Sequence, residues 1–312
     1  DPAPRVMSSM IKLVPIKKTL WYNLGQMLFN AVTCTSKESL ERNYEKEMTK
    51  VVKFGGSSLA SAQQFVKVGN IIRSDEARKY VVPSAPGKRN SKDTKVTDML
   101  YQCYALAEEE KDFSAALKKI QERYNSIING LNLTLSLDEQ FKVIAENFKK
   151  KAGSDYAASR GEFLNGIIMA EYLGYEFIDA AEVIVFDEDG EFEAEKTNKI
   201  LSERLKKCER AVVPGFYGAK EDGTVKTFSR GGSDITGSIV AKAVHADMYE
   251  NWTDVSGFLV ADPRIIENPE SIKVITYREL RELSYMGATV LHEYAVFPVR
   301  KEGLPINIRN TN

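Results

Sequence analysis

Histidine and cysteine are scarce in this chain of 312 residues, which contains two histidines and three cysteines. The cysteines, Cys34, Cys103 and Cys208, lie far apart, and neither His245 nor His292 completes a cluster with zinc-ligand spacing. The pattern therefore predicts no zinc site. Widely separated cysteines are typical of reduced thiols in a cytoplasmic protein.

Long apolar runs and a strong net charge are also missing. Without a stretch of roughly 20 apolar residues, the sequence predicts no membrane span. A formal net charge of -1 provides no general attraction to nucleic acid or to an anionic membrane, so neither is an expected partner. The remaining composition, 43% hydrophobic and 28% charged, is that of a globular protein with one large domain or two lobes.

The standard phosphate-binding motifs are absent as well, because the chain contains no Gly-x-x-x-x-Gly-Lys-Ser/Thr and no Gly-x-Gly-x-x-Gly. The stretch Val51–Ser58 nevertheless carries Lys53 from a short β-branched run into the pair Gly55-Gly56. We expect the glycines to turn with positive φ and the following serines to cap the next helix, which creates an anion site beside a fixed positive charge. The alternative is a tight turn with a solvated lysine.

Residues 1–47 look unlike the rest of the chain. They carry lysines ahead of an apolar patch, as a signal peptide does, but Asn23, Gln26 and Asn30 interrupt that patch. We favour an accessory extension, or non-native sequence ahead of a natural start at Met48.

From Val51 to Ile308 the pattern alternates between strands and helices, which predicts an α/β fold with a mainly parallel sheet covered on both faces. Strands are expected at Tyr80–Pro83, Glu176–Phe186, Ala211–Phe216 and Pro305–Ile308, with a hairpin turn at Glu221-Asp222-Gly223. Helices are expected at Ser61–Ile72, from Thr97 through Leu106, and at Phe113–Tyr124, Leu137–Phe148, Phe163–Leu173, Ile235–Ala246 and Tyr277–Met286.

Two further stretches carry charge at expected helix starts. Glu162, in Ser-Arg-Gly-Glu, could cap a helix or hold the ammonium of an amino-acid substrate. In Ser-Arg-Gly-Gly-Ser-Asp, Arg230 offers a planar fork for an anion, while Asp234 could be an N-cap or a site residue. The two glycines and the arginine together favour an anion-binding loop.

Five stretches, taken in order, resemble the catalytic domain of aspartate kinases. They are Lys-Phe-Gly-Gly-Ser-Ser, Ser-Arg-Gly-Glu, Gly-Phe-Tyr-Gly, Ser-Arg-Gly-Gly-Ser-Asp, and Thr-Asp-Val-Ser-Gly followed by Asp-Pro-Arg. The resemblance covers about Met48 to Asn312. It implies the amino-acid-kinase fold, a three-layer αβα sandwich shared with carbamate kinase, in which residues 48–210 hold the amino acid and residues 211–312 hold ATP.

The implied reaction transfers the γ-phosphate of ATP to the side-chain carboxylate of L-aspartate, a step towards lysine, threonine and methionine. By the resemblance, Lys53 contacts the phosphates and stabilises the transferred group. Gly55, Gly56 and Ser57 form the adjoining loop. Asp234 lines the reaction centre and helps to organise the phosphates with Mg²⁺.

The same resemblance assigns the amino-acid and nucleotide contacts. Arg230 pairs with the substrate α-carboxylate and Glu162 with its α-amino group. The other implied residues of the substrate pocket are Thr97, Phe216 and Ser233. The other implied nucleotide contacts are Thr253, Asp254 and Arg264.

The chain departs from the family pattern in sequence and in length. Ser229 stands where many members have glycine, Leu259 where a tyrosine can pack on the nucleotide, and Thr289 where others have lysine. Members usually continue into two ACT domains that bind an end-product amino acid and help to form dimers, so we expect a catalytic fragment or an unregulated form whose homodimer is weakened.

Two rival readings remain open at this point. One is another kinase of the same fold, acting on glutamate, acetylglutamate, carbamate or a nucleoside monophosphate. The other is a non-catalytic amino-acid-binding protein. The opposite charges of Glu162 and Arg230 suit a zwitterionic amino acid and so favour aspartate kinase over the first reading.

Overall fold

A mainly parallel sheet forms the centre of the molecule. The computed structural model describes residues 48–229 and 231–254, together with 11–13, 257, 267, 269–270, 272–285, 298–300 and 302–312. In this part of the chain, eight strands pair in the order β10-β1-β11-β9-β2-β3-β6-β4. Their bounds are β1 Ile11–Leu13, β2 Lys50–Phe54, β3 Arg78–Pro83, β4 Glu176–Phe177, β6 Ala211–Val212, β9 Met248–Thr253, β10 Val274–Ile275 and β11 Ile306–Asn310.

The six consecutive strands from β11 to β4 are all parallel to one another, which confirms the predicted sheet. At the edge, β1 pairs antiparallel with β11 and parallel with β10. A second sheet contains β5 (Val185–Phe186), β7 (Tyr217–Lys220) and β8 (Val225–Thr227). β7 and β8 form the predicted hairpin, in which Gly223 adopts a φ of 84°.

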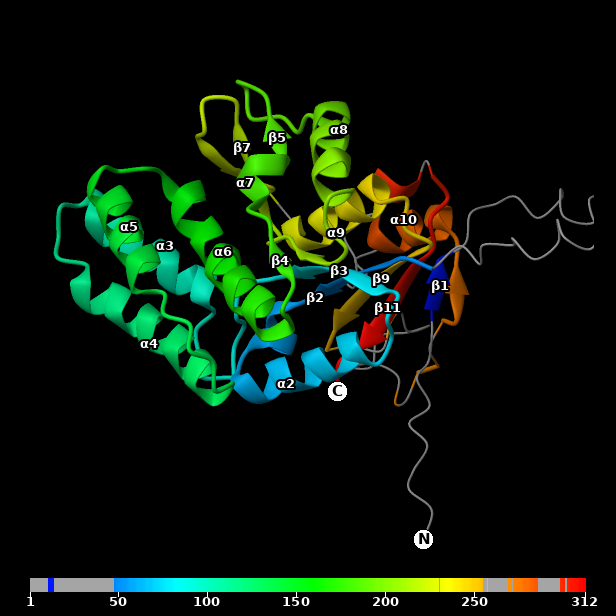
Figure 1. Cartoon of the computed structure of the whole chain (residues 1–312), viewed down its shortest axis with the longest axis horizontal. Helices are drawn as coiled ribbons and strands as arrows, with labels where there is room; N and C mark the ends of the chain where they lie inside the picture. Colours follow the sequence, from blue (N-terminus) through cyan, green and yellow to red (C-terminus); the bar gives the residue numbers. More distant parts are fainter. Residues whose placement is uncertain are drawn as a thin grey trace, which may run out of the picture.

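Helices cover both faces of the central sheet, as Figure 1 shows for α2 and α9 on opposite sides. Val52 and Phe54 belong to an apolar cluster with α2 and α6, whereas Val51 belongs to a second cluster with α8 and α9. The predicted three-layer αβα sandwich is therefore confirmed. The helices are η2 Gly56–Leu59, α2 Ala62–Arg73, α3 Val96–Glu108, α4 Ser114–Gly130, α5 Asp138–Lys149, α6 Ser154–Leu173, α7 Ala180–Val183, α8 Ala194–Leu205, α9 Gly232–Ala243 and α10 Tyr277–Tyr285.

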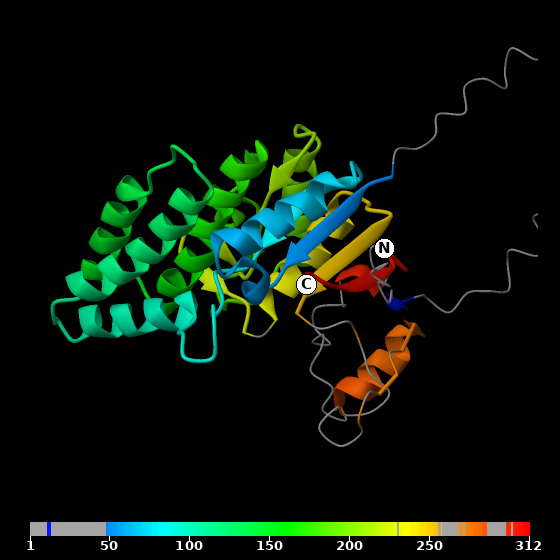
Figure 2. The same ribbon diagram turned by 90° about the horizontal axis from the view of Figure 1, so that it is seen from below.

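The helices α3, α4 and α5 form a group at one end of the molecule, beyond the edge of the sheet (Figures 1 and 2). Their apolar sides are buried, while most of their lysines and glutamates are exposed. None of the helices in the described residues is long and apolar enough to cross a membrane. Cys103 and Cys208 are buried free thiols, whereas Cys34 lies outside the described residues.

Two predicted elements differ from the structure. The strand expected at Glu176–Phe186 is divided into β4, α7 and β5, because the Asp179 side chain accepts a hydrogen bond from the Ala181 N–H at 3.0 Å and starts a helical turn. The helix expected from Phe163 begins nine residues earlier, at Ser154. Glu162 consequently lies inside α6, so the interpretation of this residue as a helix cap is wrong.

The turn after β2 also differs from the prediction. Gly55 has a φ of -70°, and Gly56 is not among the residues with positive φ. Glycine is needed here for close approach: a Cβ on Gly56 would lie 2.9 Å from the Ala85 carbonyl oxygen, and the Gly87 N–H donates to the Gly56 carbonyl at 2.7 Å. The backbones of the two loops therefore touch directly.

The serines after the glycine pair do not cap α2. Ser57 and Ser58 lie within the short helix η2, and the Ser58 hydroxyl contacts the Thr311 hydroxyl at 2.7 Å. The cap is Ser61, whose hydroxyl oxygen accepts from the Gln64 N–H at 3.4 Å. Its extended backbone at φ -155° and ψ 167° is the usual conformation of an N-cap.

A buried cluster of charges supports the sheet on its α2 side. The Glu250 carboxylate, 1% exposed, accepts from Arg78 Nε at 2.8 Å, from the Trp252 indole at 2.9 Å and from Arg309 Nη1 at 3.2 Å. Both guanidinium groups also lie over the Trp252 ring, at 5.4 and 4.4 Å from its centroid. Glu250 is therefore the shared counter-ion of Arg78 from β3 and Arg309 from β11, and Lys50 Nζ on β2 also lies 3.9 Å from its Oε1.

Replacing Glu250 by Gln should lower the free energy of unfolding by about 3–5 kcal/mol, because it leaves buried arginine charge uncompensated. Urea titration followed by circular dichroism measures the loss. As a control, Glu139→Gln removes an exposed pair with Lys142 and should change the free energy of unfolding by less than about 0.5 kcal/mol. Equal effects of the two substitutions would contradict the assignment.

Gly56→Ala should destabilise the protein by about 2–3 kcal/mol, because its methyl group would press on the backbone of the neighbouring loop. Gly55→Ala is the matched control, since its φ is negative and a Cβ there meets nothing nearer than 3.6 Å. We expect Gly55→Ala to cost less than about 1 kcal/mol on the same reasoning. If Gly55→Ala were the more destabilising change in chemical denaturation, the close-approach argument would be wrong.

Candidate active site

The strands β2, β3, β6 and β9 are parallel and lie side by side in the sheet. Their carboxyl ends therefore lie together along one edge of the sheet, the edge at which these strands end. β3, the next strand of this sheet after β2 in the sequence, pairs with one side of β2, whereas the much later strand β9 pairs with the other side of β2. In open α/β sheets, ligands bind at such a switch point, outside the carboxyl ends of the strands. The predicted site residues Lys53, Gly55 and Thr253 all lie there.

Lys53 and Asp234 form an ion pair at this edge. The Lys53 ammonium lies 2.6 Å from Asp234 Oδ1, and the lysine is only 8% exposed. Asp234 lies in the first turn of α9, whose N-cap is Gly231 in the left-handed region at φ 58°. Asp234 is thus a partner of Lys53 and not the N-cap, and the alternative of a solvated lysine is wrong.

Asn251 completes this cluster and was missed by the sequence reasoning. Its side-chain Nδ2 donates to Asp234 Oδ1 at 2.9 Å, and its Oδ1 accepts from Lys53 Nζ at 3.4 Å. In the sequence, Asn251 stands out only as a polar residue in the middle of a buried strand. Its contact with Lys53 could be inferred only once β9 was known to pair with β2.

Glu162 is a buried carboxylate inside α6. It is 6% exposed, and its Oε2 has no hydrogen-bond partner among the described residues. Burial raises the pKa of Glu162 to about 8, although a hydrogen bond from the Ala85 backbone and the charge of Arg160 act in the opposite direction. The folded protein therefore keeps Glu162 protonated below about pH 8, whereas the unfolded chain ionises it above about 4.5, so the free energy of unfolding falls as the pH rises across this range. A cationic ligand group would offset the cost of ionising Glu162.

Ala85 connects Glu162 to the glycine loop. Its backbone bonds to the Glu162 carboxylate, and its carbonyl oxygen lies against Gly56. Thr97, at the start of α3, is close by: its Oγ1 lies 3.8 Å from the Cβ position built on Gly161. The predicted residues Thr97 and Glu162 therefore lie together, next to the loop that follows Lys53.

Phe216 and Ser233 are brought together at the start of α9. A Cβ on Gly215 would lie 2.6 Å from the Ser233 side chain, and one on Gly232 would lie 2.5 Å from the Phe216 ring. Phe216 has a φ of 82°, which is rare for a bulky residue and is held by a hydrogen bond from its N–H to Thr236 Oγ1 at 3.1 Å. Thr236 was not predicted.

The end of β9 supplies Thr253 and the exposed Asp254, whose side chains hydrogen-bond to each other at 3.2 Å. The Gly55 N–H donates to the Trp252 carbonyl at 3.0 Å, so the glycine loop is fastened to this strand end. Four of the sequence-predicted positions lie outside the described residues: Arg230, Leu259, Arg264 and Thr289.

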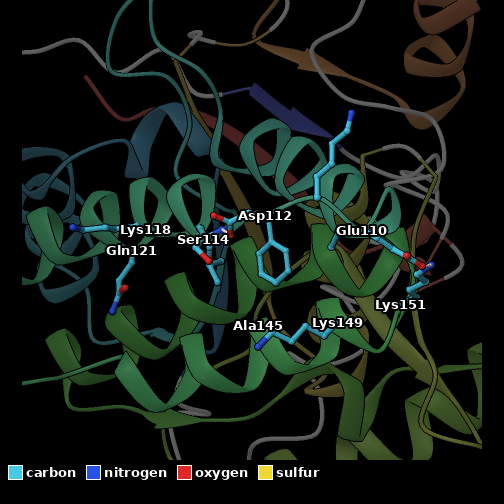
Figure 3. Close-up of a pocket in the computed structure, with 12 residues that line it drawn as sticks. Glu110, Asp112, Ser114, Lys118, Gln121, Ala145, Lys149 and Lys151 are labelled. Atoms are coloured by element: carbon cyan, nitrogen blue, oxygen red, sulfur yellow. Dashed lines mark hydrogen bonds and ion pairs between the residues drawn. The ribbon is translucent and has the colours of Figure 1, made fainter.

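A second cleft, of about 690 Å³, lies between α3, α4 and α5 and shares no residue with the site (Figure 3). Its lysines and acids are exposed, and Lys151 pairs with Glu110 at 3.1 Å. Within the described residues, no group of three or more acidic, histidine or cysteine side chains could hold a metal ion.

Comparison with known proteins agrees with this arrangement. The model of the Amino acid kinase family matches residues 48–310. Aspartokinase 3 of Bacillus subtilis (strain 168) is 41% identical over an alignment of 277 residues, which covers 84% of this chain and 61% of that protein. The crystal structure of Clostridium acetobutylicum aspartate kinase superposes with a TM-score of 0.81 at 56% identity, over 85% of this chain and 60% of that one.

A more distant structure, that of E. coli aspartokinase III in complex with lysine and aspartate, has a TM-score of 0.71 at 26% identity and covers 84% of this chain and 62% of that one. The chain thus spans about three fifths of the length of these relatives. Because the family model extends over most of the sequence and the described fold agrees with it, this chain belongs to the amino acid kinase family.

Proposed function

We propose that this chain catalyses the aspartate kinase reaction, in which the γ-phosphoryl group of ATP passes to the side-chain carboxylate of L-aspartate and gives 4-phospho-L-aspartate. The main structural support is the Lys53–Asp234 pair, which lies at the same sheet edge as the buried carboxylate of Glu162. Relatives named aspartokinase or aspartate kinase at 41% and 56% identity support the same acceptor. The product would serve lysine, threonine and methionine synthesis in the cytoplasm.

The residues suit an acceptor that needs no base. A carboxylate is already ionised at neutral pH, so positioning and neutralisation of charge are the tasks left to the protein. One oxygen of the acceptor bonds to the γ-phosphorus as the bond to the ADP oxygen breaks. Lys53 would stabilise the charge on the transferred group, and Asp234 would keep its ammonium in place before the phosphates arrive.

The acceptor would be held at both ends of its backbone. Glu162 offers a carboxylate oxygen that has no hydrogen-bond partner in the described part of the chain, which suits the α-ammonium group of an amino acid. Arg230, between β8 and α9 in the sequence, would pair with the α-carboxylate. Thr97, Phe216 and Ser233 would form the rest of this pocket. E. coli aspartokinase III, which has been crystallised with aspartate, supports this ligand class.

The nucleotide would lie against the glycine loop and the end of β9, in contact with Gly55, Gly56, Ser57, Thr253, Asp254 and Arg264. Mg²⁺ usually binds to one or two carboxylates together with substrate phosphates and waters, and the single carboxylate of Asp234 fits that mode. The bound ion would neutralise phosphate charge. In this proposal residues 48–210 hold the amino acid, residues 211–312 hold ATP, and two copies form a homodimer.

Incubation with aspartate, Mg-ATP and hydroxylamine should trap the acyl phosphate as a hydroxamate. Lys53→Ala should lower kcat by about 10²–10³-fold, because it removes the charge that stabilises the transferred group. Lys142→Ala, an exposed lysine on α5, should retain the wild-type rate. Hydroxamate formed with glutamate and not with aspartate would reject the proposed acceptor, and an unchanged rate in Lys53→Ala would reject the role of the lysine.

Aspartate should bind more tightly as the pH rises from 6 to 8. In the unliganded protein Glu162 keeps its proton below a pKa of about 8, and pairing with an ammonium requires its release. The affinity should therefore rise by about tenfold per pH unit in the lower half of this range. Isothermal titration calorimetry in two buffers of different ionisation enthalpy measures both the affinity and the released proton.

Glu162→Gln provides the control for this pH dependence. It should bind aspartate at least about tenfold more weakly at pH 8.5, because a charge-assisted hydrogen bond is lost. Its affinity should also vary little between pH 6 and 8. An equally steep pH dependence in the variant would show that another group titrates.

A further inference from the structure

Asn251 lies directly opposite Lys53 in the sheet. The two residues are register partners in the parallel pair β9 and β2, so their side chains leave the sheet on the same face, towards α9. Asn251 is 3% exposed. A polar side chain buried this deeply is expected to have hydrogen-bond partners, and here both partners are charged groups of the candidate site.

The amide of Asn251 bridges the two ends of the Lys53–Asp234 pair. Its NH₂ group donates to Asp234 Oδ1 at 2.9 Å, and its carbonyl oxygen accepts from Lys53 Nζ at 3.4 Å. If the amide were flipped, its NH₂ donor would face the Lys53 ammonium and its carbonyl oxygen would face the Asp234 carboxylate, and neither contact could be a hydrogen bond. The charges of the pair therefore determine the orientation of the amide.

Among the described residues, this arrangement leaves one donor of the Lys53 ammonium without a partner. Of its three N–H groups, one serves Asp234 and one serves Asn251. The ammonium lies 3.6 Å from the Cβ position built on Gly55, so it is next to the side of the loop that has no side chain. The Asn251 amide holds the Lys53 ammonium from the side of the strand. This contact limits how far the ammonium can turn towards Asp234, and so how far it can turn away from an incoming phosphate.

We propose that Asn251 is a positioning residue for phosphoryl transfer, which orients the Lys53 ammonium and the Asp234 carboxylate through one bridging amide. The proposal rests on the proposed function for the nature of the transferred group. A residue with a single hydrogen-bonding role could not replace it, because the bridge needs a donor and an acceptor on the same short side chain. Leucine, of similar size, keeps the packing and loses both contacts.

The test compares Asn251→Leu with Asn307→Leu. Asn307 is a fully buried asparagine in the neighbouring strand β11, and within the described residues its side chain hydrogen-bonds only to Met248 Sδ, at 3.8 Å. Asn251→Leu should lower kcat by about 10–100-fold and change KM for aspartate by less than about threefold, because the orientation of Lys53 towards the phosphates is lost and the aspartate contacts are not. Asn307→Leu should keep kcat within about twofold. Equal losses of kcat in the two variants, or an unchanged kcat in Asn251→Leu, would overturn the proposal.

A binding cycle tests whether Asn251 acts through Lys53. Asn251→Leu should weaken binding of a non-hydrolysable Mg-ATP analogue by about three- to tenfold in the wild-type background. The same change should have no effect when Lys53 is already alanine. An equal loss in both backgrounds would overturn the proposal. Binding of the Mg-ATP analogue does not depend on the acceptor. If aspartate failed as a substrate, the proposed function would be rejected, and the binding cycle would still decide whether Asn251 positions Lys53.

Discussion

The ion pair between Lys53 and Asp234 joins the centre of the sheet to the start of α9, and the rest of the site is arranged about it. Both side chains are largely shielded from water, where charges 2.6 Å apart attract each other more strongly than on the surface. The position of Asp234 in the first turn of α9 adds the favourable end of the helix dipole. Lys53 is thereby held beside Asp234 until an anion competes for its donors.

β9 serves two purposes on its two faces. Glu250 and Trp252 leave it towards α2 and hold the arginines that support the sheet, whereas Asn251 leaves it towards α9 and contacts Lys53 and Asp234. Side chains alternate strictly along a strand, so a slip of one residue would exchange the two sets. The register of β9 against β2 therefore controls both the stability of the sheet and the assembly of the site.

The sequence allowed much of the fold to be predicted, because buried parallel strands and amphipathic helices have distinct periods. It also placed Lys53 near the end of a strand and Asp234 at the start of a helix, whereas Glu162, expected at a helix start, lies inside α6. What it could not supply was tertiary proximity. The close approach of Gly56 to Ala85, the contact of Asn251 with Lys53 and the left-handed backbone of Phe216 all depend on segments far apart in the chain. The strand expected at Glu176–Phe186 failed because Asp179 offered a local helical cap.

The order of strands also bears on how the chain acquires its structure. Lys53 and Asn251 are 198 residues apart, and β6 is inserted between β3 and β4, so the first half of the sequence cannot complete its own sheet. During synthesis, the side of β2 that pairs with β9 remains unpaired until α9 and β9 have been made. Contacts between residues so far apart in the sequence form slowly. The apolar cluster around α2 to α6 can gather early, whereas the site closes among the last events of folding. A newly made chain would therefore hold much of its helical structure before Lys53, Asn251 and Asp234 came together.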